Sequence, residues 1–260
     1  MKPQRPDPVA FLTGRLSNAP RPEAIKPAGS GGKFALDGTV ERFPGNTVIC
    51  HIDRRSEAFR ELVALQSALR EGPHARHFTF MPPDSFHMTV FGGVTEPLRG
   101  TERWPRGIPH DAATQDVTDE FARRLAGTGA PSGHAIKVDD VFAGYSVTVS
   151  GATAGQEASL RDLRDRLRDA TGLHDPEHDA YVFHITLAYL VEWVEETAAR
   201  EIVESSDRLG REFRSRLPTI ELGPPEFCSF QSMYRFDPLG HLGPDGLEPL
   251  PVGAAPSGAV

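Results

Sequence analysis

The amino-acid sequence predicts an α+β fold in which two pseudo-symmetric lobes form a central cleft. Two observations lead to this prediction. Segments with the composition of strands and helices follow one another in the same order twice, and each round contains a strand with His and Thr at alternate positions. The 260 residues, 38% hydrophobic and 25% charged, have the length and composition of a globular domain large enough to bury a closed site.

The first lobe is expected over about residues 33–130. Its helix has apolar residues at helical spacing and begins after Ser56, a suitable N-cap. The Pro-rich turn PPDS at 82–85 predicts that the strands on its two sides form a hairpin. The expected elements are a strand, a helix, two strands and a helix, at residues 46–52, 56–72, 77–81, 86–94 and 117–127.

The second lobe is expected over about residues 131–240 and again contains a strand, a helix and a strand with the HxT motif, in that order. The leucines of its first helix share one face, as they do in a helix that packs on a sheet. The expected elements are two strands, a helix, a strand, a helix and one or two closing strands, at residues 135–144, 145–151, 156–172, 181–190, 195–213 and 225–238.

The two ends of the chain are expected to lie outside the lobes. Residues 1–32 are rich in proline and should form a disordered leader, and residues 241–260 should form a mobile tail. The leader lacks the apolar segment of a secretory signal, and no apolar run is long enough to span a membrane. Cys50 and Cys228 form neither a disulfide framework nor a CxxC metal site, so we expect free buried thiols in a cytoplasmic protein.

The charge of the chain limits its partners. The net charge is −8 and no segment is strongly basic, which argues against long double-stranded nucleic acid, whose affinity depends on neutralised phosphates. A small nucleotide or an RNA end is compatible with this charge, because a few local cations suffice to bind it. We expect no membrane partner, and a monomer.

Two strands carry the chemistry that the sequence offers. On a strand, residues i and i+2 share a face, so His87 and Thr89 lie together, backed by Phe86, Met88 and Val90 on the other face. The same frame of Phe, His, apolar, Thr, apolar returns at residues 183–187 with His184 and Thr186. If the lobes are related by approximate two-fold symmetry, all four polar groups converge on the cleft.

Such a set suits phosphodiester chemistry. One imidazole takes a proton from the attacking oxygen, the other protonates the leaving oxygen, and both hydroxyls bind the phosphate. The two histidines are expected on opposite walls of the cleft. A third triplet, His77 to Thr79, lacks the full frame, so we expect a structural or rim position for His77.

Five segments together resemble the two-histidine (2H) phosphoesterases, the superfamily of cyclic phosphodiesterases and 2′,5′ RNA ligase-like proteins, in an uncharacterised bacterial branch. The resemblance covers about residues 33–238. It implies antiparallel sheet with flanking helices, a catalytic acid and base in His87 and His184, phosphate ligands in Thr89 and Thr186, and no metal or other cofactor. The segments are GNTVICHI (45–52), SFHMTVFGG (85–93), WP (104–105), YVFHITLAYL (181–190) and FCSFQSMYRF (227–236).

Several assignments stay open. Either histidine is a candidate for the acid, and His51 either contacts the site or caps a strand. The candidates for stacking on a base or binding a phosphate are Tyr145, Tyr234, Arg76 and Arg235.

The main hypothesis is a metal-independent phosphodiesterase that acts on a cyclic phosphate or on a 2′,5′ or 3′,5′ linkage in a small nucleotide or RNA end. The alternatives are a nucleotide- or RNA-binding module without turnover, a metal hydrolase built around HDPEHD (174–179), whose simpler interpretation is a solvated loop, and RNA ligation.

Overall fold

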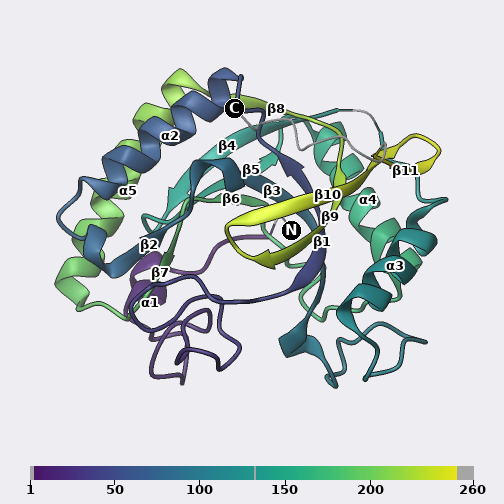
Figure 1. Ribbon diagram of the computed structural model, residues 1–260. Helices are drawn as coiled ribbons and strands as arrows, with labels where there is room; N and C mark the ends of the chain where they lie inside the picture. The colour runs from purple at the N-terminus through teal and green to yellow at the C-terminus, as the bar shows by residue number, and fades with distance from the viewer. Residues whose placement is uncertain (1–2, 132, 251–260) are drawn as a thin grey trace.

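The computed structural model describes residues 3–131 and 133–250. Its centre is a curled, antiparallel nine-stranded sheet in the order β11-β10-β9-β1-β3-β6-β5-β4-β8. Helices α2 and α5 lie side by side on one flank of this sheet, and α3 and α4 lie on the other (Figure 1). The predicted α+β class with antiparallel sheet and flanking helices is confirmed. The helices are α1 (Pro8–Leu12), α2 (Glu57–Arg70), α3 (Thr114–Leu125), α4 (Ala154–Thr171) and α5 (Glu196–Arg216).

Each predicted lobe contributes strands to this one sheet. The strands of the sheet are β1 (Gly45–His51), β3 (His87–Thr95), β4 (His134–Phe142), β5 (Ser146–Gly151), β6 (His184–Thr186), β8 (Thr219–Leu222), β9 (Glu226–Ser232), β10 (Arg235–Gly243) and β11 (Gly246–Pro249). Since β9 pairs with β1, the C-terminal strands complete the half of the sheet that begins with the first lobe. A division of the chain near residue 130 therefore does not divide the sheet.

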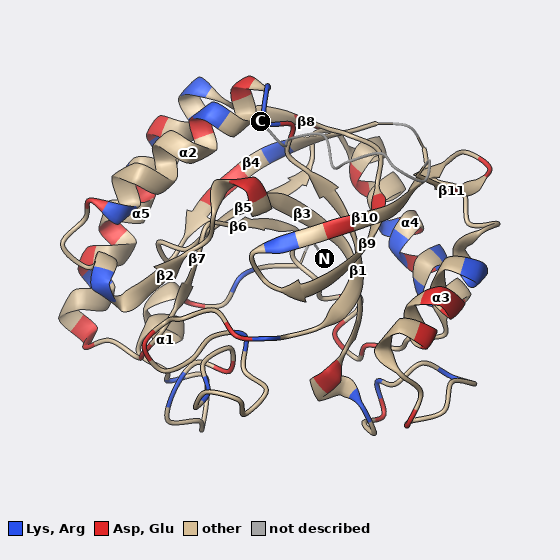
Figure 2. Ribbon diagram, in the orientation of Figure 1, with Lys and Arg blue, Asp and Glu red and all other residues tan. Residues whose placement is uncertain are grey.

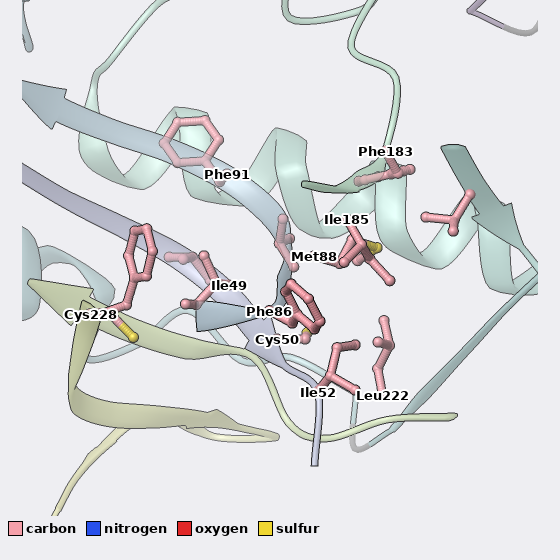
Figure 3. Close-up of a cluster of buried hydrophobic side chains, with 14 of the residues drawn as sticks. Ile49, Cys50, Ile52, Phe86, Met88, Phe91, Phe183, Ile185, Leu222 and Cys228 are labelled. Atoms are coloured by element: carbon pink, nitrogen blue, oxygen red, sulfur yellow. The ribbon is translucent and has the colours of Figure 1, made fainter. Parts of the chain in front are cut away.

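The two HxT strands meet in the middle of the sheet. β3 pairs with β6 at Met88 and Ile185, both fully buried. Figure 3 shows these two side chains next to each other in the core, with Phe86 and Cys50 close by. The apolar residues of both motifs thus fix the two strands from behind, as their alternation predicts. Cys50 and Cys228 are free and buried, as expected.

The expected hairpin around PPDS does not form. β2 (Phe78–Phe80) pairs instead with β7 (Ala188–Leu190) in a separate two-stranded sheet. Between β2 and β3 the chain forms a 3₁₀ turn at Pro83–Ser85, and β3 then pairs with β1 and β6. The prolines therefore mark a change of sheet rather than a tight turn between paired strands.

The N-terminal segment differs most from expectation. Instead of a disordered leader, residues 3–32 include α1 and pack on the domain. Leu12 is fully buried, its carbonyl oxygen accepts a hydrogen bond of 3.0 Å from the Val194 amide, and the Phe11 ring stacks on Tyr145. Apolar side chains between the prolines provide the contacts that order this segment, and proline lowers the entropy lost on ordering.

The other end of the chain also extends the sheet. Residues 241–243, expected in a mobile tail, belong to β10, and β11 pairs with it. Residues 1–2 of the expected leader and 251–260 of the expected tail lie outside the described residues. In the described parts of the chain, every helix is too short or too polar to cross a bilayer.

Candidate functional site

His87 and His184 are held in the same way. The Nδ1 atom of His87 lies 2.7 Å from the carbonyl oxygen of Ser85, and that of His184 lies 2.8 Å from the carbonyl oxygen of Val182. A carbonyl oxygen only accepts, so Nδ1 carries the proton in both rings. Each neutral imidazole therefore keeps Nε2 free to accept a proton.

The register places the four motif residues on one face of the sheet. Met88 lies opposite Ile185 in an antiparallel pair, so His87 lies across from Thr186 and Thr89 across from His184. Each histidine thus has a hydroxyl beside it from the other motif. The histidines stand on a diagonal of neighbouring strands, where residues are about 7–8 Å apart and their Cβ atoms somewhat closer. They share one face, which we call the inner face, rather than opposite walls of a cleft.

Both imidazoles favour the neutral form. Burial lowers the pKa of His184 to about 3, and the positive charge of Arg5 adds to this effect. Burial likewise lowers the pKa of His87 to about 4, although the hydrogen bond to the Ser85 carbonyl opposes it. Lys33 lowers both pKa values further. Two neutral bases therefore share the inner face at neutral pH.

Two cations reach the inner face from the N-terminal part of the chain. The Arg5 guanidinium lies 3.3–3.4 Å from the hydroxyls of Thr148, Ser146 and Tyr145. The Lys33 amine lies 3.4 Å from the Tyr189 hydroxyl. Within residues 3–131 and 133–250, no carboxylate lies within 4 Å of either cation. Unpaired cations among hydroxyls and neutral imidazoles form an environment that favours an anion.

The charged side chains of the domain lie mostly away from the two motif strands. Figure 2 shows Lys, Arg, Asp and Glu concentrated on the outer helices, whereas β3 and β6 carry none of them. Ser146 lies across from Thr186, and Thr148 across from His184, so β5 adds two hydroxyls to the inner face. The half-buried phenol of Tyr181 interacts with Thr89, which adds another neutral hydroxyl to this surface.

The four candidate binding residues fall in different places. Tyr145 reaches the site, because its hydroxyl contacts Arg5. Tyr234 packs near the Phe34 ring, at the turn between β9 and β10. Arg76 is exposed in a 3₁₀ turn, and Arg235 is exposed and paired with Asp237. The structure does not bring these two arginines to the histidines.

The contacts of His51 and His77 show where these two histidines lie relative to the site. His51 lies across from His87 on β1, with ring centroids 6.3 Å apart, and its Nδ1 pairs with the Glu226 carboxylate. It therefore borders the site. His77 is buried away from β3, and its Nδ1 lies 2.9 Å from a carboxylate oxygen of Glu192. Its position is structural, as expected for an incomplete motif.

The HDPEHD segment is tied to α4. His178 is buried, and its Nε2 lies 2.9 Å from an Asp165 carboxylate oxygen. The Arg164 guanidinium donates to the carbonyl oxygen of His178 and to that of Val90 on β3. Asp165, His178 and Asp179 lie close enough to share a cation, but the ion pair and the buried arginine already give the loop a structural role.

Sequence reasoning missed several groups at the inner face. Ser146 and Thr148 alternate with buried valines in YSVTVSG, the same period-two signal that identified the histidines. Lys33 and Arg5 lie in segments without periodicity, so no local signal indicated them. Tyr189 lies on β7, after the break in the strand at Leu187, and its hydroxyl lies 3.4 Å from the Lys33 amine.

Comparison with known proteins identifies the family. Residues 33–145 match the family model described as 2H-phosphodiest, domain of unknown function (DUF1868). The crystal structure of ATU0111, a conserved protein of unknown function from Agrobacterium tumefaciens, is 30% identical, with 90% of this chain and 98% of that chain covered and a TM-score of 0.83. The chain belongs to the 2H phosphoesterase superfamily. Membership of this superfamily supports a phosphoesterase-type function for the 2H protein.

More distant structures also align with the 2H protein. Apo LigT from E. coli is 12% identical over 78% of this chain and 99% of LigT, with a TM-score of 0.43. LigT complexed with 3′-AMP is 15% identical over 76% of this chain and 96% of that chain, with a TM-score of 0.40. No curated protein matches the chain. The superfamily name comes from the family model, and the Agrobacterium protein shares the fold and 30% sequence identity with this chain.

Proposed function

We propose that this 2H protein is a metal-independent phosphodiesterase that acts on a cyclic phosphate, or on a 2′,5′ or 3′,5′ linkage, of a small nucleotide or RNA end. One observation carries the proposal. Two imidazoles with free Nε2 atoms stand on neighbouring strands, each beside a threonine of the other motif. This pairing supplies a proton acceptor and a proton donor to one phosphorus centre.

In the proposed reaction on a 2′,3′-cyclic phosphate, water attacks phosphorus. Nε2 of one histidine takes the water proton as the new P–O bond forms. The second histidine, protonated at Nε2, gives its proton to the ribose oxygen as the P–O bond to it breaks. Thr89 and Thr186 hydrogen-bond the non-bridging oxygens, whose negative charge rises in the transition state. The product is a phosphate monoester, and the two histidines have exchanged roles.

Either histidine can serve as the acid, with the other as the base. Burial lowers the pKa of both imidazoles, and Arg5 also opposes protonation of His184. Lys33 and Arg5 supply the charge that a phosphodiester anion needs, which removes the need for a metal ion in this mechanism.

The proposed partner is a small nucleotide or RNA end bound by a monomer, in agreement with the acidic charge of the chain. Two free cysteines favour a reducing compartment, and we propose a cytoplasmic location.

The experiment uses 2′,3′-cyclic nucleotides, ADP-ribose cyclic phosphate and 2′,5′-linked oligonucleotides, with and without a chelator. The variants are His87→Asn and His184→Asn, because the asparagine amide can keep the hydrogen bond to Ser85 or Val182. We expect each variant to lose about 10²–10⁴ in kcat, since each removes one proton-transfer group.

The matched control is His77→Asn, which changes the third HxT triplet outside the site and should keep full turnover of the same substrate. Thermal melts establish that all three variants are folded. Activity that survives either site substitution contradicts the mechanism, loss with chelator indicates a metal hydrolase, and tight nucleotide binding without turnover indicates a binding module.

A further inference from the structure

The N-terminal segment crosses the inner face of the sheet. In Figure 1 the chain before α1 runs from that helix into the curl of the sheet. α1 holds the end of this segment that is farther from the site. Leu12 is buried, and the turn that follows, Thr13 to Arg15, packs with Gly14 against the Trp193 ring. Residues 3–6 and Pro8 line a cavity of about 440 Å³ together with residues of β4, β5 and α5. The segment is therefore anchored at α1 and borders open space before that helix.

Arg5 lies where this segment meets the site. Its three nitrogens approach the hydroxyls of Ser146, Thr148 and Tyr145 at 3.3–3.4 Å, which are long contacts for a guanidinium. The Phe142 ring lies 5.0 Å below the guanidinium carbon and supports it. In the described parts of the chain no carboxylate is within ion-pairing distance of Arg5. A planar cation so placed has donors left for an anion.

The position of Arg5 relative to the motifs is fixed by the register of β5 and β6. Ser146, on which one Arg5 nitrogen rests, lies across from Thr186. Thr148, on which another rests, lies across from His184. The guanidinium thus borders one histidine and one threonine of the site, and its charge acts directly on His184.

We propose that Arg5 is a phosphate-binding residue of the site, brought to the inner face by the N-terminal segment as an arm. The proposal rests on the proposed function, since its ligand is the phosphoryl group held between His87 and His184. Two donors of the guanidinium fork bind two oxygens of that group, a geometry that lysine cannot reproduce. The hydroxyls of Ser146 and Thr148 hold the fork in place before the anion arrives.

The alternative is that the arm only covers the site and competes with ligand. The two alternatives predict opposite changes in the affinity for anions when Arg5 is replaced. A phosphate-binding arginine raises affinity for anions, whereas a cover lowers it, so removal of the Arg5 charge separates them without any need for turnover.

The experiment measures binding of inorganic phosphate and of 2′-AMP by calorimetry to the full chain. Arg5→Met keeps a side chain of similar length without charge and should weaken binding by about tenfold to a hundredfold, the value of charge-assisted hydrogen bonds. Arg5→Lys should recover part of the loss. The control is Arg15→Met, which removes an exposed arginine of the same segment, 3.8 Å from Glu196, and should leave binding unchanged.

Steady-state kinetics on the best cyclic phosphate should show a raised KM for Arg5→Met. Weaker phosphate binding by this variant supports the assignment even if the wild-type protein turns over no diester, in which case only the proposed function fails. Equal or tighter binding by Arg5→Met overturns the assignment, as does a wild-type protein that binds neither phosphate nor 2′-AMP.

Discussion

Acid should destabilise this protein more steeply than a variant without the two site histidines. The perturbation is the double substitution His87→Asn and His184→Asn, compared with wild type between about pH 8 and about pH 5. Folding lowers the pKa of His87 from 6.5 to about 4 and that of His184 from 6.5 to about 3. The unfolded chain therefore binds more protons below pH 6.5, and the free energy of unfolding falls as the pH drops toward the folded pKa values.

The magnitude follows from these values. At about pH 5 an unfolded histidine is almost fully protonated while both folded rings stay neutral, which is equivalent to about 2 kcal/mol for each residue. Both rings are partly exposed on the inner face, so solvent screens part of this effect. We expect about 1 kcal/mol each, or about 2 kcal/mol of stability lost by wild type beyond the loss in the double variant.

Urea denaturation at several pH values, followed by circular dichroism, measures this difference. The other histidines are common to both proteins, so their contributions cancel. A variant with His110→Asn, an exposed histidine, controls for the removal of an imidazole as such. Parallel stability curves for wild type and the double variant would falsify the conclusion that the site imidazoles are held neutral.

Two further predictions concern the supports of the site. Gly93→Ala places a Cβ 2.0 Å from the Asn46 side-chain oxygen and 2.4 Å from its carbonyl oxygen, so urea denaturation should show a loss of about 3 kcal/mol or more, whereas Gly92→Ala meets no atom within 4 Å and should cost less than about 1 kcal/mol. Arg164→Met removes donors from the carbonyl oxygens of Val90 and His178, at 2.5 and 3.1 Å, and should cost about 2–4 kcal/mol by the same measurement. Equal stability of the two glycine variants, or a wild-type melting curve for Arg164→Met, would contradict these packing arguments.

The alternation of residues along a strand made the centre of the site predictable. It assigned His87 and Thr89 to one face and Met88 to the core, and the structure has Met88 fully buried against Ile185. The rule is local, because successive side chains of a strand must point to opposite faces. Applied to YSVTVSG it would also have placed Ser146 and Thr148 on a common face.

Pairing between distant segments was not predictable in the same way. The turn at PPDS suggested a hairpin, yet β2 pairs with β7, which follows it by about a hundred residues. A short strand such as Phe78–Phe80 carries too little pattern to specify its partner, and the choice depends on packing of the whole domain.

The N-terminal segment could not be assigned a role at the site from local sequence pattern either. Its prolines and glycines argued for disorder, but Phe11 and Leu12 pack in one cluster with Tyr145 and residues of α5 and help to dock the segment. Composition records the average of a segment, whereas docking depends on one or two side chains. Arg5 was therefore invisible to any argument from local pattern, although it lies beside the site.

The fold and the proposed reaction impose opposite demands on the histidines. Burial keeps both imidazoles neutral, Lys33 adds to this effect at both rings and Arg5 adds to it at His184, yet the mechanism needs one of the rings protonated. A phosphodiester anion reverses this field: it pairs with Lys33 and Arg5, and its own charge favours a proton on the nearer imidazole. On the proposed mechanism the acid is therefore formed only with substrate bound, because the anion both cancels the repulsion and attracts the proton. Lys33 and Arg5, which pair with no carboxylate among residues 3–131 and 133–250, then have two roles: they favour an anionic substrate, and they help to keep the bases neutral until it binds.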